Sequence, residues 1–371
     1  MDWLKTVLKM FTDARRNVER GFFSLWFKTT DEDYTKGDLV EIDVERTTNV
    51  VAPTLRDAST GAVIVKSDSW KENKFRPPYT ALEDPIAVNS LLQKQPGETD
   101  DATRVGTWFG RLANKVVKSL ARFHRMIGLN VDLQCAQIMQ TGEVTLKDDK
   151  NGTTYKLNFG AAVSHFPTAA ISWGTSGATP VDDVAALADR VADDGQVAPA
   201  YLILGDNAWK NLLKDTTFQS LVRKDGLGLG VLSPSSIRAR GGKYHGICDF
   251  GSHTLEIWTY GGTYYELGSN VPKKYLDTNA AIVTADPDNV DFRTVYAGIV
   301  DDPEDIDRPF DEIVPRVVTF GDSANGEGFI QVHDRVYHDK KRKTWIAESS
   351  ARPLSIPVSI DRFGCLKTQT A

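Results

Sequence analysis

The side chains of this chain that could do chemistry are mainly histidines and cysteines, and one group has a spacing that could bind a metal. His245, Cys248 and His253 lie close together in the sequence. Imidazole and thiolate groups are ligands that zinc prefers in proteins. No fourth ligand is evident nearby, so the spacing favours hydrogen-bonded or solvated side chains over a metal centre. A metal-dependent hydrolase that uses these three residues is the enzymatic alternative.

A second histidine pair, His333 and His338, is five residues apart and each member precedes an aspartate. On a helix this spacing rotates the two side chains about 140° from each other, and on a strand it places them on opposite faces. Only a loop would let the two imidazoles converge. The spacing therefore argues against a second metal site.

The glycine-rich stretches also fail the tests for nucleotide binding and for acyl transfer. The glycines between Gly226 and Gly230 do not match the dinucleotide fingerprint, and Gly241-Gly242-Lys243 is followed by Tyr244 where a P-loop has Ser or Thr. Ser176, between Thr175 and Gly177, does not complete the G-x-S-x-G pattern of a nucleophile elbow. We therefore predict that the protein is not an enzyme and that it uses no cofactor.

The composition is that of an ordinary soluble protein. The chain has 371 residues, 41% hydrophobic and 25% charged, with a net charge of −6. This length predicts two domains or one elaborate domain, and the acidic total argues against a protein that mainly wraps nucleic acid. The cysteines Cys135, Cys248 and Cys365 are isolated, which fits a reducing compartment. No apolar run is long enough to span a bilayer, so we expect folding in the cytoplasm.

The stretch from Thr99 to Thr141 is the element that must position everything else. Its apolar residues recur at gaps of three and four, which predicts one long helix that ends before Gly142. Such a helix is about 60 Å long at 1.5 Å per residue, too long for one compact core to cover. It is interpreted as a spine against which other segments or subunits lie. The stripe comprises Val105, Trp108, Phe109, Leu112, Val116, Leu120, Phe123 and Ile127.

Basic residues follow the same helix, and no acid interrupts them between Asp101 and Asp132. One interpretation is a face whose charges are met by acids of neighbouring subunits. The other is a surface that looks at DNA phosphates. The first is favoured because the aromatic residues lie on the apolar stripe, where bases could not stack on them. The row comprises Arg104, Arg111, Lys115, Lys118, Arg122 and Arg125.

Two segments before the spine carry little core of their own. Asp2–Phe27 is amphipathic, and it could lie on a membrane or dock on a protein; its mixed charges favour a protein. Glu45–Pro85 predicts a β-hairpin, with Val50-Val51 and Ala62–Val65 as its strands. Three aromatic residues follow in that segment, which indicates an extended loop that packs on a neighbouring molecule. They are Trp70, Phe75 and Tyr79.

After the spine, the pattern predicts an α+β fold with no internal repeat. A hairpin is expected over Glu143–Phe159, and an inserted domain starts at Pro180. A late strand over Thr344–Cys365 is split by Pro353 and Pro357, which favours an edge or a bulge. Within the inserted domain we expect helices at 182–192 and 207–213, strands at 200–204, 280–284 and 294–299, and a hairpin of 255–260 with 263–266.

Three short stretches resemble the lambda-type phage major capsid proteins (the E family), which have the Hong Kong 97 capsid fold. They are Thr141-Gly142-Glu143 at the end of the spine, Tyr201–Leu204 followed by Asn207-Ala208-Trp209, and Lys343–Leu354. The resemblance covers roughly Val50 to Cys365 and rests mainly on the order of the elements. It implies an N-terminal arm (1–44), an extended loop (45–85), a peripheral domain (86–179), an axial domain (180–320) and a return segment (321–371).

The resemblance also implies a function. The protein would be a major capsid protein that forms pentamers and hexamers and builds an icosahedral head shell around double-stranded DNA, without sequence recognition and without a membrane. A separate scaffolding protein, a portal and a possible decoration protein are the implied partners, with assembly in the host cytoplasm and a place in the virion. Lys66 lies where some relatives form a crosslink, although an ordinary solvated lysine is favoured. The residues expected at subunit interfaces are Arg56, Lys66, Trp70, Phe75, Tyr79 and the six bases of the spine.

Overall fold

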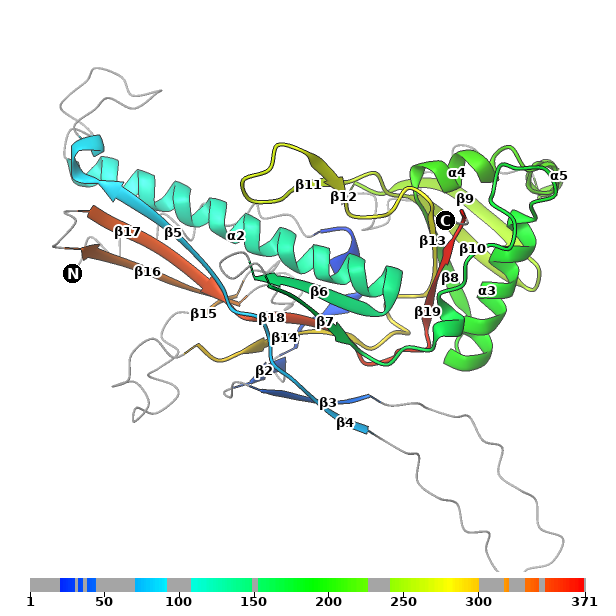
Figure 1. Ribbon diagram of the computed structural model, residues 1–371, viewed down its shortest axis with the longest axis horizontal. Coiled ribbons are helices and arrows are strands. Elements are labelled where there is room, and N and C mark those ends of the chain that lie inside the picture. The colour runs from blue at the N-terminus through cyan, green and yellow to red at the C-terminus, as the bar shows by residue number, and fades with distance from the viewer. Residues whose placement is uncertain are drawn as a thin grey trace, which may run out of the picture.

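The computed structural model describes most of the chain, which forms an elongated molecule built along the long helix α2 (Figure 1). Several predicted features lie outside the described residues: Arg56, Lys66, Trp70, Arg104, the hairpin strands at 50–51 and 62–65, and the glycines at 226–230. The described residues are 21–30, 33–35, 39–44, 71–91, 108–148, 153–225, 241–299, 317–319, 331–339 and 344–369.

The predicted spine helix is confirmed as α2 (Trp108–Thr141), with 34 residues, or about 51 Å. It ends where the sequence indicates, because Gly142 has a positive φ of 69° and its N–H donates to the carbonyl of Ile138 at 2.7 Å. This left-handed conformation is the usual glycine stop. The start predicted at Thr99 lies outside the described residues.

The N-terminal half of α2 packs on a four-stranded sheet in the order β15-β16-β17-β5. The apolar stripe of the helix, from Leu112 to Phe123, is buried against Ile86 and Ala347. The strands are β5 (Thr80–Ala87), β15 (Val317–Thr319), β16 (Gln331–Asp339) and β17 (Thr344–Ala351). All eight residues of β5 pair with β17, so residues 80–85 of the predicted extended-loop segment form part of a sheet strand.

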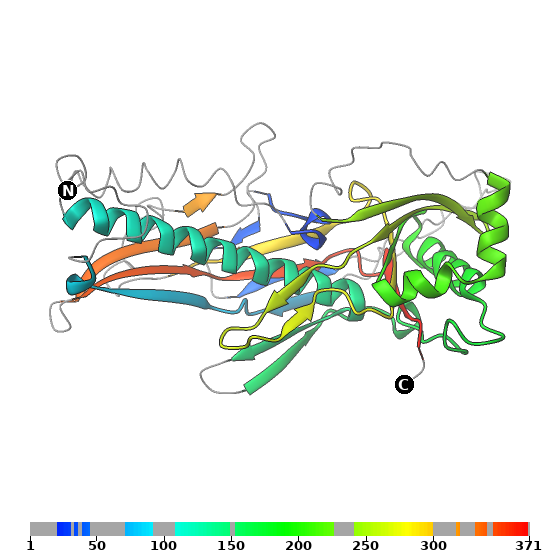
Figure 2. The ribbon, with the colours of Figure 1, turned by 90° about the horizontal axis from the view of Figure 1, so that it is seen from above.

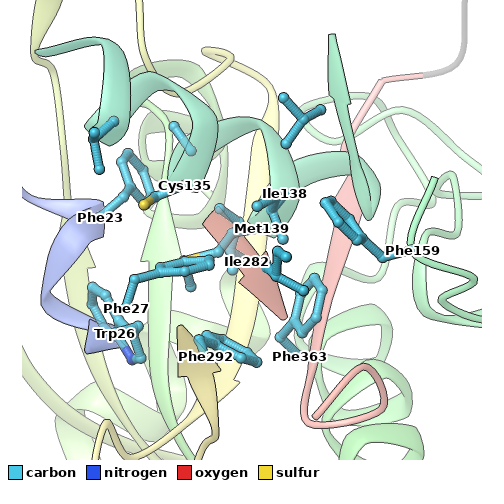
Figure 3. Close-up of a cluster of buried hydrophobic side chains, with 14 of the residues drawn as sticks. Phe23, Trp26, Phe27, Cys135, Ile138, Met139, Phe159, Ile282, Phe292 and Phe363 are labelled. Carbon is cyan, nitrogen blue, oxygen red and sulfur yellow. The ribbon is translucent and has the colours of Figure 1, made fainter. Parts of the chain in front are cut away.

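The C-terminal half of α2 covers a second small sheet that brings together distant parts of the chain. Its strands are β1 (Phe27–Lys28), β2 (Tyr34–Thr35), β14 (Phe292–Ala297) and β18 (Pro353–Pro357). Side chains from the N-terminal segment, the helix and the later strands meet here in the largest buried cluster (Figure 3). Next to it, β3 (Val40–Val44) pairs with β4 (Lys71–Phe75), and this ribbon forms the base of the predicted extended loop.

The inserted region forms a five-stranded sheet in the order β19-β13-β8-β10-β9. The predicted helices and three predicted strands appear with small shifts at their ends, as α3 (Pro180–Gly195), α4 (Asp206–Leu212), β8 (Pro199–Leu204), β13 (Ala280–Ala285) and β14. A further helix, α5 (Thr216–Asp225), follows α4, and the helices lie at one end of the molecule (Figure 1). The other strands are β9 (Lys243–Phe250), β10 (His253–Thr259) and β19 (Phe363–Lys367).

The hairpin predicted across Gly261-Gly262 is wrong. Strand β10 instead pairs antiparallel with β9 and parallel with β8, while β11 (Thr263–Tyr265) pairs with β12 (Pro272–Lys274). The reason is packing: most of β10 is buried in the interior of the sheet, where both of its edges must be paired. Gly262 lies so close to the ring of Tyr260 that a Cβ there would be 2.3 Å from its hydroxyl oxygen, so the chain crosses the aromatic ring at this point.

The hairpin after the spine is confirmed as β6 (Glu143–Asp148) and β7 (Thr153–Asn158), paired from Glu143↔Asn158 to Asp148↔Thr153. The predicted late strand, in contrast, is three strands in three sheets. Pro353 opens β18 directly after β17, and Phe363 opens β19. Strands β18 and β19 both lie at sheet edges, as the prolines indicated, whereas β17 lies between β16 and β5.

Candidate functional site

The three residues of the candidate metal site do not converge. His245 lies on β9, where its Nε2 is 2.8 Å from the hydroxyl of Thr259 and its ring is 4.0 Å from that of Trp209. Burial, and secondarily the charge of Lys243, lowers the pKa of His245 to about 4. The thiol of Cys248 points into the core, and His253 makes a separate 3.0 Å contact with Asp189.

Each of these side chains therefore has its own structural partner. Within the described residues, no group of three or more His, Cys, Asp or Glu side chains is arranged to hold a metal ion. His333 and His338 also lie apart, on opposite faces of strand β16. The ring of His338 packs 5.0 Å from that of Trp345.

The basic row on α2 forms one continuous stripe. Lys118, Arg122 and Arg125 are exposed, while Arg111 and Lys115 are half-buried. Successive members are four or three residues apart, so they share a face of the helix opposite the buried apolar stripe. The sequence thus correctly grouped these bases on one helix face, and the structure turns that face away from the chain's own sheet.

The two predicted loop aromatics that the structure describes have different environments. Tyr79 is 57% exposed and is available to a neighbouring molecule. Phe75 is only 9% exposed, with its ring 5.2 Å from that of Phe159. Its expected interface role therefore needs correction, because the side chain belongs to the chain's own core at the base of the loop.

The apolar block of the N-terminal segment is also part of the chain's own core. Phe22, Phe23 and Trp26 are fully buried, and the ring of Phe22 stacks on that of Tyr260 at 4.3 Å. Figure 3 shows Phe23, Trp26 and Phe27 beside residues of α2, β13, β14 and β19. For this block, the predicted docking on a partner or a membrane is wrong. Residues 2–20 lie outside the described part.

Two buried polar contacts that hold α2 in place were missed by sequence reasoning. Asp132, 1% exposed, accepts a 2.9 Å hydrogen bond from the backbone N–H of Ser24. His124, also 1% exposed, has its Nε2 2.7 Å from a carboxylate oxygen of Asp334 on β16, and the same oxygen accepts a bond from Ser349. Their positions next to the apolar stripe are the signal that could have identified them.

The buried carboxylate of Asp132 acts on two neighbouring titratable groups. Burial raises the pKa of the Cys135 thiol, and the nearby carboxylate of Asp132 raises it further. The same two causes raise the pKa of the Tyr260 hydroxyl. These groups therefore stay protonated at neutral pH, and the site is a structural junction between the N-terminal segment and the helix.

Taken together, the functional candidates of the described residues are surfaces. They are the basic stripe of α2, the exposed Tyr79 beside the extended loop, and the hairpins β6–β7 and β11–β12. Figure 2 shows both hairpins on the elongated body. No helix in the described part of the chain combines the length and apolar content that a membrane crossing requires. Surfaces of this kind suit contacts with other macromolecules.

Comparison with known proteins identifies a family. The sequence model of the phage major capsid protein E family matches residues 6–310. No curated protein matches the chain. A solved structure assigned as a prophage capsid protein of Escherichia coli CFT073 superposes with a TM-score of 0.63 at 15% identity, covering 98% of each chain. A phage-related protein of Bordetella bronchiseptica RB50 gives 0.49 at 13% identity, covering 97% of this chain and 96% of that one.

Proposed function

Since this chain belongs to the phage major capsid protein E family, we propose that its copies assemble through pentamers and hexamers into an icosahedral head shell around double-stranded DNA. The protein is a shell-forming capsid protein of the virion and not an enzyme, and its α+β fold is of the Hong Kong 97 type. The observation that carries the proposal is the family match over residues 6–310. Head-to-tail contacts between copies generate closed rings, and rings that contact each other tile a shell.

In this proposal the two ends of the elongated body have different tasks. The five-stranded sheet with α3, α4 and α5 is the axial domain, which meets its copies around the symmetry axes. Helix α2, the sheet containing β5 and the hairpin β6–β7 form the peripheral domain. The separate sheets at the two ends of the molecule support this division.

The ribbon β3–β4 suggests how the extended loop could reach a neighbour. Its strands run out of the body of the molecule, and the segment 45–70 connects their far ends (Figure 1). An isolated two-stranded ribbon is marginally stable in water, so packing on a neighbouring copy would stabilise it. Arg56, Lys66 and Trp70 belong to that proposed contact, together with the exposed Tyr79 at its base.

For the basic stripe of α2, we favour contact with acidic groups of neighbouring copies over contact with DNA. Its exposed members, Lys118, Arg122 and Arg125, carry three like charges on one helix face, and acidic groups of a neighbouring copy would complement them. Reversing two of these charges, Lys118→Glu with Arg122→Glu, should prevent shell assembly. A matched control is Lys118→Arg with Arg122→Lys, which keeps both positive charges at the same positions. If the variant still forms shells but these contain less DNA, the basic stripe contacts DNA and not a neighbouring copy.

Assembly is expected in the host cytoplasm, with a separate scaffolding protein, a portal and a possible decoration protein as partners. The first experiment is negative-stain electron microscopy and light scattering of the purified chain, alone and after co-expression with the scaffolding protein of its phage. Shells, or rings of five and six copies, are the expected result. Monomers under both conditions would contradict the proposed assembly.

A further inference from the structure

The ribbon β11–β12 carries an unusually exposed apolar tip. Tyr265, Leu267 and Val271 are 64%, 73% and 65% exposed, and all three lie within residues 263–274, named here the tip hairpin. Figures 1 and 2 show the tip hairpin projecting from the five-stranded sheet, with its turn away from that sheet. Three large apolar side chains exposed within twelve residues of one projecting element are typical of an interaction surface.

The base of the tip hairpin is fixed inside the chain. Tyr275, which directly follows β12, is 5% exposed; its ring lies 4.9 Å from that of Tyr264, and its N–H donates to the carbonyl of Gly262. Lys274 pairs with Asp206 of α4. The base is thus held before any partner arrives, which lowers the entropy cost of binding.

The charges of the tip hairpin are already paired within the chain. Lys273 contacts Glu266 at 2.6 Å, and the third charge is the Lys274 that contacts α4. From Leu267 to Pro272 the turn contains no charged residue. An uncharged apolar turn does not suit DNA, which is bound mainly through its phosphates. It suits the centre of a protein interface, where charged residues are depleted.

We infer that the tip hairpin docks on a second copy of this chain, through an uncharged surface, as a lateral contact of the shell. This inference rests on the proposed function, because a shell surrounds each copy with other copies. The paired charges and the uncharged turn fit a contact between copies of one chain, because each copy has the same net charge of −6 and an uncharged surface avoids bringing like charges together. The contact adds a surface to those of the extended loop and the α2 stripe.

The first test introduces charge at the tip. The double variant Leu267→Asp with Val271→Asp would bury two unpaired carboxylates at the contact. We expect the fraction of protein in shells to fall about tenfold or more, since each 1.4 kcal/mol per contact is a factor of ten. Leu267→Met keeps an apolar side chain and should assemble normally. Because both residues are exposed, the thermal unfolding of unassembled double-variant subunits should match that of the wild type.

A second test identifies the occupant. All three native cysteines are buried, so Leu267→Cys gives one exposed thiol to carry a benzophenone maleimide. Shells are assembled from a mixture of unlabelled and ¹⁵N-labelled chains, irradiated and analysed by mass spectrometry. Crosslinked peptides that pair unlabelled with labelled chains are the expected result. Crosslinks only within one isotope, or to a different protein, would overturn the inference.

The two levels of the proposal fail differently. If the wild type assembles and the double variant assembles equally well, the tip hairpin is no contact and the shell function stands. If the wild type forms no shells with its scaffolding protein, the proposed function fails and the inference fails with it. If the double variant is unfolded as a subunit, the tip has a role within its own chain, and the isotope experiment decides. Mixed-chain crosslinks would then support the inference, and their absence would overturn it.

Discussion

Replacing Trp26 by alanine should strongly destabilise the unassembled subunit. The indole is fully buried, its ring lies 5.8 Å from that of Tyr201 in an edge-to-face arrangement, and its Nε1–H donates to the carbonyl of Ala285 at 3.4 Å. Removing a fully buried Trp side chain costs about 3–5 kcal/mol of unfolding free energy. The hydrogen bond is long, and it accounts for only about 0.5–1.5 kcal/mol of this. Trp26→Phe should therefore cost less than half as much as Trp26→Ala.

The assay is urea unfolding of unassembled subunits, followed by far-ultraviolet circular dichroism because the variants alter the tryptophan fluorescence. The midpoint should shift while the slope of the transition stays the same, which shows that stability and not compactness has changed. Lys28→Ala is the matched control in the same segment. Its pair with Asp288 lies at the surface and should be worth less than about 1 kcal/mol.

The refuting result is a loss below about 1 kcal/mol for Trp26→Ala, equal to that of the control. Such a result would mean that the block from Phe22 to Phe27 is detachable from the core. The segment would then be available for a protein partner, which is the interpretation that the sequence alone favoured.

Three more predictions follow from other parts of the structure. The pKa of His245 is lowered to about 4 in the folded protein, whereas its ordinary value in the unfolded chain is 6.5. Between these two values the unfolded chain binds a proton that the folded protein does not. The free energy of unfolding is therefore undiminished above pH 6.5 and falls as the pH is lowered toward 4. His245→Gln should reduce that loss in thermal unfolding scans, by about 1 kcal/mol for a half-exposed group. Gly205→Ala should reduce the free energy of unfolding by about 3 kcal/mol or more, because the new Cβ would lie 2.2 Å from the carbonyl oxygen of Asp277. Thermal unfolding should show this as a lower melting temperature. Deleting Thr48–Trp70 should leave thermal unfolding intact but abolish shells in electron micrographs; an unfolded or insoluble variant would contradict the loop's independence from its own core.

The elements that the sequence predicted well are those whose pattern is local. The apolar stripe of α2 and the two strands of the β6–β7 hairpin follow from patterns of consecutive residues, and the fold contains both. Strand β9 also has a local signal, since Gly246, Cys248 and Phe250 alternate on its buried side. His245 and Cys248 on this strand were interpreted as possible metal ligands, and the alternation of buried residues was not used to predict a strand.

Pairing between distant segments could not be predicted in the same way. Strand β10 pairs with β9 and β8 because of burial from several directions, which short-range patterns do not contain. Strand β16 was hidden because the polar Asp334 is buried on its inner side, where it meets His124. Composition likewise cannot distinguish an aromatic block that enters its own core from one that enters a partner.

The surfaces were the hardest part to predict. The basic stripe of α2 could be predicted because helical spacing places its bases on one face. The sequence of the tip hairpin contains no comparable periodic pattern. Its residues Tyr265, Leu267 and Val271 look like strand and core residues until their exposure is known. Phe75 shows the opposite case, a loop aromatic that is buried.

The three late strands have a consequence for the time course of synthesis. Strands β17, β18 and β19 follow one another within residues 344–367, yet each completes a different sheet. On the ribosome, none of these sheets can close until that stretch has been translated and has left the exit tunnel. Long-range pairing of this kind is slow to form. A nascent chain that has not yet emerged as far as residue 367 therefore lacks a strand of at least one of these three sheets.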